Sequence, residues 1–301
     1  MNAAARKKMH ADRLLLNVVG YLLVGLVALA CLIPLIVVIS GSLTSETHIL
    51  EDGFRFWPKA FDTSAYAFAL KEPATLLRSY GLTISLTAVG TLAGLFISAM
   101  AAYVLQRQDF HWRSGFAFYF YFTTLFGGGL VPWYILMVNY LHLKNTYGAL
   151  LLPPMLSVFY ILILRTFMRS IPEAITESAK IDGAGDFTVF VRLILPLSKP
   201  GLATIGLFTA LNYWNDWFNS LLFIESSSEK LYTLQYLLYR SLGNLEGVRR
   251  IMEVTGLNVG PLPGENLKMA LAIIATGPIV LLYPFVQRYF VQGLTIGAVK
   301  G

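Results

Sequence analysis

Residues 14–39 read LLLNVVGYLLVGLVALACLIPLIVVI, a stretch without a single charged side chain. A helix needs about 20 consecutive apolar residues to cross the hydrocarbon layer of a membrane. Backbone polar groups in lipid must be satisfied within the segment itself, which forces the segment to be helical. The stretch therefore predicts a transmembrane helix. It is longer than the apolar region of a cleaved signal peptide, so we expect it to remain as an anchor.

Five more apolar blocks of similar length follow in the chain. Only 13% of the 301 residues are charged, whereas about 25% is usual for a soluble domain. Four of the blocks are free of charge and one carries a single acidic residue, Asp216; the predicted spans are about 15–40, 80–105, 115–141, 147–165, 200–224 and 268–288. The sequence thus predicts an all-α, polytopic membrane protein with six transmembrane helices.

The net charge of +6 does not indicate nucleic-acid binding, because the basic residues are dispersed at the ends of the apolar blocks. Short loops rich in Lys and Arg stay on the cytoplasmic side. The basic residues of segments 1–14 and 106–114 therefore predict that both termini are cytoplasmic. The lone Cys31 lies inside the first span and excludes an intramolecular disulfide, and the four scattered histidines show no metal-ligand spacing.

The second predicted span is studded with small residues, including a Gly90–Gly94 pair. Small residues allow close helix–helix approach in lipid, so we expect this span to be buried in the bundle.

The third span contains Gly127, Gly128 and Gly129 and then Pro132, which disfavour a straight helix. Broken helices at membrane depth often mark a substrate route in transporters. The alternative interpretation is a simple turn near the outer interface.

The fifth span carries Asp216 beside Tyr213, Asn215 and Asn219. A charge in hydrocarbon is costly and should face a cavity or a partner. Aromatic rings with amide and carboxylate groups suit a sugar, so one hypothesis is that these four residues line a substrate pathway. The other is an interfacial aromatic belt with Asp216 at headgroup level.

The loop between the fourth and fifth spans, residues 170–197, predicts a helix–turn–helix. Ser170 with Glu173 resembles a capping box, and Pro172 suits a first helical turn. Their helical spacing places Ile171, Ala174, Ile175 and Ser178 on one side of the first helix, with Glu173, Glu177 and Lys180 elsewhere around it. Gly183 and Gly185 can end the helix in the left-handed conformation, and Asp186 can cap a second helix.

This loop also carries a motif: Glu177-Ser178-Ala179, three residues, Gly183, nine residues, Leu193, one residue, then Leu195-Pro196. It resembles the Glu-Ala-Ala loop of the permeases of binding-protein-dependent ABC importers, with Ser178 in place of Ala and Leu193 in place of Ile. The resemblance covers most of the chain from about residue 75, and three further stretches resemble carbohydrate-uptake permeases, in particular the smaller six-helix permease of maltose-type systems: residues 128–132, 213–217 and 283–301.

The resemblance implies a type I ABC importer permease fold in a bacterial cytoplasmic membrane. It implies that the loop is a coupling helix that docks on a separate ATPase dimer, through Glu177, Ser178, Ala179, Asp182, Gly183, Leu195 and Pro196. Glu177 would meet a basic residue of the ATPase. The implied partners are a second permease subunit, an extracytoplasmic solute-binding protein, membrane lipid and a carbohydrate, more particularly an oligosaccharide.

The energy source also points to a partner. The chain contains no Gly-Lys pair and therefore no Walker A loop, so ATP-Mg would be bound by the ATPase and this chain itself is not an enzyme. Alternatives are an importer permease for polyamine, phosphate, peptide or another small solute, an ion-coupled secondary transporter, and a membrane-embedded enzyme. A secondary transporter usually carries several polar groups in its spans, and only Asp216 lies clearly within one here.

The predicted organisation has two parts. Residues 1–74 form an N-terminal tail, the first transmembrane anchor and an outer loop. Residues 75–301 form the permease core, with the coupling loop 170–197 and a C-terminal tail, 289–301, that by the same resemblance reaches toward the ATPase.

Overall fold

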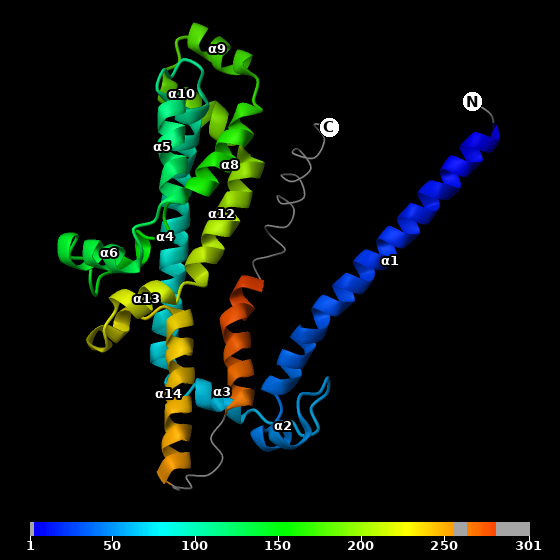
Figure 1. Cartoon of the computed structure of the whole chain (residues 1–301), viewed down its shortest axis with the longest axis vertical. Coiled ribbons are helices and arrows are strands. Elements are labelled where there is room, and N and C mark those ends of the chain that lie inside the picture. The colour runs from blue at the N-terminus through cyan, green and yellow to red at the C-terminus, as the bar shows by residue number, and fades with distance from the viewer. Residues whose placement is uncertain (1–2, 256–263, 281–301) are drawn as a thin grey trace. The chain divides into compact units, whose positions relative to one another are not determined.

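The computed structural model describes residues 3–255 and 264–280, and these residues are predominantly helical (Figure 1). The chain divides into two compact units: Met1–Lys71 with Asn244–Thr276, and Glu72–Gly243 with Gly277–Gly301. The predicted all-α fold is confirmed. The C-terminal tail 289–301 and the motif residues 283–301 lie outside the described residues.

The first unit contains α1 (Ala3–Ser42), α2 (Glu46–Asp52), α3 (Ser64–Ala69) and helical turns over residues 265–276. The most apolar window of α1 has no buried residue, as expected of a helix whose natural surrounding is lipid. The carboxylate of Glu46 is buried and accepts the backbone N–H groups of Gly264, Glu265 and Asn266 at 3.0–3.1 Å. It thereby satisfies the free donors at the start of the last helix, a contact that the sequence did not predict.

The second unit is built from short and long helices in chain order. Its elements are α4 (Pro73–Gln106), α5 (Arg113–Leu125), α6 (Leu130–Ile135), η1 (Leu136–Tyr140), α7 (Tyr147–Leu151), α8 (Val158–Arg169), α9 (Glu173–Ile181), α10 (Asp186–Val189), η2 (Phe190–Ile194), α11 (Leu195–Leu197), α12 (Lys199–Trp214), α13 (Phe218–Phe223) and η3 (Ser226–Leu231). Helix α14 (Leu234–Thr255) passes from this unit into the other.

Two helices among the described residues are long and apolar enough to cross a membrane, Leu14–Ser42 and Pro73–Gln106. Two bent pairs raise the number to four: Arg113–Leu125 with Leu130–Tyr140, bent by 112°, and Asp186–Leu197 with Lys199–Trp214, bent by 82°. The number of six spans therefore stays a prediction.

The break predicted in the third span is confirmed. Helix α5 ends at Leu125 and α6 begins at Leu130, and between them Gly129 adopts φ +85°. That conformation is strained for residues with a Cβ, so glycine allows the sharp bend.

Helix α4 is the central helix of its unit and packs against both α8 and α12 (Figure 1). A Cβ on Gly90 would stand 2.1 Å from the ring of Tyr213, and a Cβ on Gly94 would stand 2.3 Å from the carbonyl oxygen of Met155. Both glycines are therefore sites of close approach, and the prediction that this small-residue span is buried in the bundle is confirmed.

Candidate functional site

Helix α9 begins at Glu173, directly after Pro172, and not at a capping box. The hydroxyl of Ser170 donates to the carbonyl of Phe167 at 2.7 Å, because Ser170 ends the preceding helix α8. The Glu173 carboxylate instead accepts a hydrogen bond from the side chain of Gln108 at 2.8 Å. The predicted capping box is therefore wrong: both side chains have other partners.

The predicted glycine stop at the end of α9 is confirmed at Gly183, which adopts φ +83°. The N–H of Ala184 donates to the carbonyl of Ala179 and that of Gly183 to the carbonyl of Lys180, the two bonds of a Schellman motif. Gly185 has φ −69° and is not left-handed, so its predicted stop is wrong. Asp186 is the first residue of α10 rather than its cap, because Arg107 binds its carboxylate.

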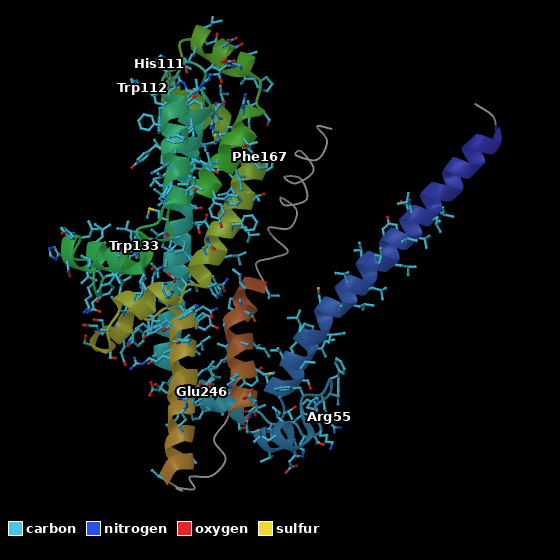
Figure 2. The ribbon with its side chains drawn as sticks, viewed as in Figure 1. Arg55, His111, Trp112, Trp133, Phe167 and Glu246 are labelled. Carbon is cyan, nitrogen blue, oxygen red and sulfur yellow. The ribbon has the colours of Figure 1, made fainter. Side chains whose placement is uncertain are left out.

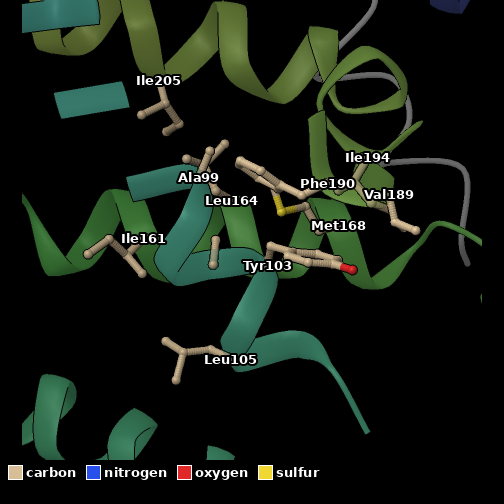
Figure 3. Packing of buried hydrophobic residues seen from close by; sticks show 11 residues of the cluster. Ala99, Tyr103, Leu105, Ile161, Leu164, Met168, Val189, Phe190, Ile194 and Ile205 are labelled. Atoms are coloured by element: carbon tan, nitrogen blue, oxygen red, sulfur yellow. The ribbon is translucent and has the colours of Figure 1, made fainter. Parts of the chain in front are cut away.

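The face that α9 and the residue before it turn toward the bundle agrees with the prediction in part. Ile171 and Ile175 are half-buried as the spacing indicates, whereas Ala174 and Ser178 are exposed and Ala179 is half-buried in their place. Helix α10 and η2 are anchored more deeply: Val189, Phe190 and Ile194 belong to a buried cluster with side chains of α4, α8 and α12 (Figure 3). The α10–η2 segment is therefore the buried part of the loop, and α9 is its more exposed part.

A network of charges joins this loop to the turn after α4. The Arg107 guanidinium binds Asp109 and reaches Asp186 at 2.7 Å, and the Lys180 ammonium lies 3.1 Å from Asp109 and 3.5 Å from Asp186. The hydrogen bond from Arg107, aided by that from Lys180, holds the pKa of the Asp109 carboxyl well below its usual range. This turn, with exposed His111 and Trp112, lies at the same end of the unit as α9 (Figure 2).

The outer surface of the loop is unusual for a charged, exposed segment. Ile181 is 86% exposed and Phe187 64% exposed. Glu177 is also exposed and lines a cavity of about 710 Å³ between the α4–α5 turn, the end of α8, and α9. Ile181 and Phe187 were not predicted as functional residues; the signal that marks them in the sequence is an apolar side chain on each side of the glycine turn.

The remaining loop residues named from the sequence hold the turn. Asp182 is the C-cap of α9 and is exposed, Leu195 packs partly on the buried cluster, and Pro196 is exposed.

The second candidate region is the break between α12 and α13, which the sequence did not predict. The Asp216 carboxylate accepts the backbone N–H of Asn219 at 3.1 Å and its side-chain amide at 2.8 Å. The acidic group therefore has hydrogen-bond donors where the chain leaves α12, which lessens the cost of placing it in an apolar block.

Asn215, Asp216 and Asn219 line one hollow of about 430 Å³, together with Asn212, Trp217 and Phe218. The structure does not place Tyr213 there: it is buried, and its hydroxyl donates to the carbonyl of Leu151 at 2.6 Å. Gly128 and Gly129 lie at the α5–α6 break and are not among the residues that line this hollow.

Taken together, long apolar helices, a broken span and a helical loop with an exposed apolar surface define a multi-pass membrane permease. The chain matches the model of the family described as binding-protein-dependent transport system inner membrane component over residues 15–296, and it belongs to that family. It is therefore the membrane subunit of an importer whose ATPase is a separate subunit, as the sequence predicted.

The similarity extends over nearly the whole chain. It is 38% identical over 285 residues to Protein LplC of Bacillus subtilis (strain 168), covering 95% of each chain. It is 36% identical over 282 residues to the polygalacturonan/rhamnogalacturonan transport system permease protein YtcP of the same organism, covering 94% of this chain and 96% of the relative. The crystal structure of a bacterial ABC transporter involved in the import of alginate has a chain that matches with a TM-score of 0.76 and 29% identity, covering 93% of this chain and 98% of that one. The resemblance to carbohydrate-uptake permeases is confirmed.

Proposed function

We propose that this chain carries an oligosaccharide across the cytoplasmic membrane of a bacterium, driven by an ATPase that docks on residues 170–197. The proposal includes a second permease subunit, a solute-binding protein that delivers the sugar, and both termini in the cytoplasm. It keeps residues 1–74 as the anchor region and 75–301 as the permease core, with the tail 289–301 directed toward the ATPase.

The observation that supports the coupling role is that the exposed helix α9 is joined to the buried α10–η2 segment. A docking helix must offer apolar surface to its partner and still be fixed to the helices that it moves. Ile181 and Phe187 offer that surface, and Glu177 offers a charge for a basic residue of the ATPase. Aromatic and aliphatic anchors with a charged neighbour are typical of protein interfaces.

The loop motif has a physical role in this proposal. Small side chains at Ser178 and Ala179 let α9 approach its partner and its own bundle closely. Asp182 and Gly183 set the turn, and Leu195 with Pro196 ends the second helical segment before α12. These residues together fix the angle at which α9 meets the ATPase.

The cargo is inferred from the relatives and from the hollow beside α13. Relatives carry names of permeases for polygalacturonan, arabinooligosaccharides, lactose and trehalose/maltose. The hollow presents amides of Asn212, Asn215 and Asn219 with the rings of Trp217 and Phe218, a combination that suits sugar hydroxyls and C–H faces. A polyamine is less well supported, because the Asp216 carboxylate is already engaged by Asn219.

The coupling role is tested by co-purification of the ATPase from membranes with the wild type and with a Glu177→Ala, Gly183→Pro double variant. Proline fixes φ near −65°, which is incompatible with the φ of +83° at Gly183. The expected result is loss of the ATPase from the double variant. Gly185→Ala is the matched control, because Gly185 has φ −69° and no atom within 4 Å of an added Cβ. Failure of any ATPase to associate with the wild type would contradict the proposal.

The pathway role is tested separately by sugar uptake in Asp216→Ala. We expect uptake to be lost while the complex still assembles with its ATPase. Asp216→Asn is the control, because its amide oxygen can still accept from the N–H of Asn219. Unchanged sugar uptake in Asp216→Ala would contradict the assignment of Asp216 to the substrate pathway.

A further inference from the structure

Arg107, the first residue after α4, is the node of the charge network. Its Nε lies 2.7 Å from Asp109 Oδ1, and its Nη1 lies 2.7 Å from Asp186 Oδ1. Its guanidinium also lies 5.7 Å from the centre of the Tyr103 ring. The Arg107 side chain is only 17% exposed, against 53% for Asp109 and 57% for Asp186. Both carboxylates therefore converge on one largely covered cation.

The turn after α4 contacts both ends of α9. At the first residue of α9, Glu173 accepts from Gln108, and in its last turn Lys180 binds Asp109. Lys180 and Asp186 also flank the glycine turn that joins α9 to α10. The three consecutive residues Arg107, Gln108 and Asp109 thus hold α9 at two points and α10 at one.

The connectivity of the chain shows why these contacts matter. Helix α8 precedes the loop and α12 follows it, so both are joined to it through the backbone. Helix α4 has no such connection and meets the loop through side chains. These contacts are the Arg107 network, the rings of Phe96 and Tyr103 at 5.9 and 5.3 Å from that of Phe190, and the buried cluster around Phe190. Tyr103 lies one helical turn before Arg107, so the Arg107 network and the Tyr103 stack act on the same end of α4.

Helix α4 also reaches the second candidate region. Gly90 of α4 receives the ring of Tyr213, which lies in the last turn of α12 just before Asn215 and Asp216. A displacement of α4 would therefore be passed to the last turn of α12, which leads directly into the hollow beside α13.

We propose that Arg107 is a positioning residue that links the docking helix α9 to α4, so that displacement of α9 by the ATPase is passed to α4. The inference rests on the proposed coupling function of residues 170–197. An arginine suits this role because its planar fork binds two carboxylates through separate N–H groups in a fixed geometry. The Lys180 ammonium also lies near both carboxylates, but as a point charge on a flexible stem it does not fix their orientation. Without Arg107, α9 would still dock, but its displacement would reach α4 only through the apolar contacts of η2 with α4.

The test uses the complete importer, with the partner permease, the ATPase and the binding protein, reconstituted in lipid vesicles. Arg107→Gln, Arg107→Lys and Asp186→Asn are compared with Arg113→Gln. Arg113 starts α5 in the same turn, but its guanidinium reaches the backbone oxygen of Arg107 rather than a carboxylate. Uptake of arabinotriose and trigalacturonate is measured together with ATP hydrolysis, and co-purification reports assembly.

The expected result for Arg107→Gln is intact assembly and ATP hydrolysis with sugar uptake per ATP reduced about tenfold, within the usual range for coupling between sites. Arg107→Lys should show a smaller reduction of sugar uptake per ATP than Arg107→Gln, and Arg113→Gln should show the same uptake per ATP as the wild type. The double variant Arg107→Gln, Asp186→Asn should be no worse than Arg107→Gln alone, because the arginine acts through that carboxylate.

An unchanged ratio, or a parallel loss of uptake, hydrolysis and assembly in every Arg107 and Asp186 variant, would overturn the inference. If the wild type accumulates neither sugar, the proposed cargo fails. The role of Arg107 is then decided by the stimulation of ATP hydrolysis by the binding protein, because that signal must also pass from the membrane helices through α9 to the ATPase. Loss of this stimulation in Arg107→Gln but not in Arg113→Gln supports the proposed link between α9 and α4 through Arg107. Equal stimulation in both variants contradicts it.

Discussion

Two polar networks of the second unit differ in their chemistry. Beside α13, short buried side chains hold the chain: Thr233 donates to the carbonyl of Asp216 at 2.7 Å, and Thr83 accepts the N–H of Leu234 at 2.9 Å. Beside α9, long charged side chains meet around the largely covered guanidinium of Arg107, and the carboxylates of Asp109 and Asp186 are half-exposed. Buried groups that lose their partners cost free energy, whereas exposed ion pairs contribute little and can rearrange. The buried hydrogen bonds beside α13 therefore suit a part of the protein that stays fixed. The ion pairs beside α9 suit a part that moves during transport.

The largest expected effect on stability comes from breaking the buried network. Thr83→Val keeps the shape of the side chain but leaves the buried N–H of Leu234 without its acceptor. We expect the free energy of unfolding to fall by about 2 kcal/mol, measured by thermal unfolding in detergent. Thr83→Ser retains the hydroxyl and serves as the control. Equal stability of Thr83→Val and the wild type would show that the hydrogen bond between Thr83 and the N–H of Leu234 does not hold the start of α14 in place.

A smaller effect is expected at the turn between the two helical segments of the loop. Gly183→Ala places a Cβ at φ +83°, where L-residues lose roughly 1 kcal/mol, although no atom within 4 Å obstructs it. Hydrogen exchange of residues 173–184 should accelerate, while exchange in α4 stays unchanged. Gly185→Ala, at φ −69°, should leave both rates as they are. Acceleration in both variants would contradict the left-handed assignment.

The smallest effect on stability is expected in the exposed network. Asp109→Asn should lower the free energy of unfolding by about 0.5 kcal/mol or less, because the carboxylate is half-exposed and screened. Since the folded pKa of Asp109 is depressed, its contribution is present above the unfolded pKa, about 3.9, and is lost as the pH falls through the folded value. Denaturation of wild type and variant should therefore differ equally at pH 6 and pH 8. A difference that grows between these pH values would contradict the assignment.

The sequence predicted the features that local chemistry determines. Long charge-free runs predicted membrane helices, Gly129 predicted a break, and Gly183 predicted a left-handed stop. These features depend on residues next to one another in the chain. The spacing of the Glu-Ala-Ala-type motif predicted the family for the same reason.

The sequence did not predict contacts between residues far apart in the chain. Ser170 and Glu173 fit a capping box locally, but Phe167 and Gln108 supplied other partners. The break at Asn215 to Trp217 contains no glycine or proline, so nothing in the pattern marked it. Tyr213 was grouped with Asp216 by proximity in sequence, yet its ring packs on Gly90.

The central claim, that the ATPase docks on the 170–197 loop, is tested most directly by photocrosslinking in native membranes. A photoreactive amino acid is placed at Ile181 or Phe187, with Leu50 of α2, which is also exposed, as the control position. The account predicts crosslinks to the ATPase from Ile181 and Phe187 and none from Leu50. Crosslinks to lipid alone from both loop positions, with the ATPase present in the membrane, would contradict it.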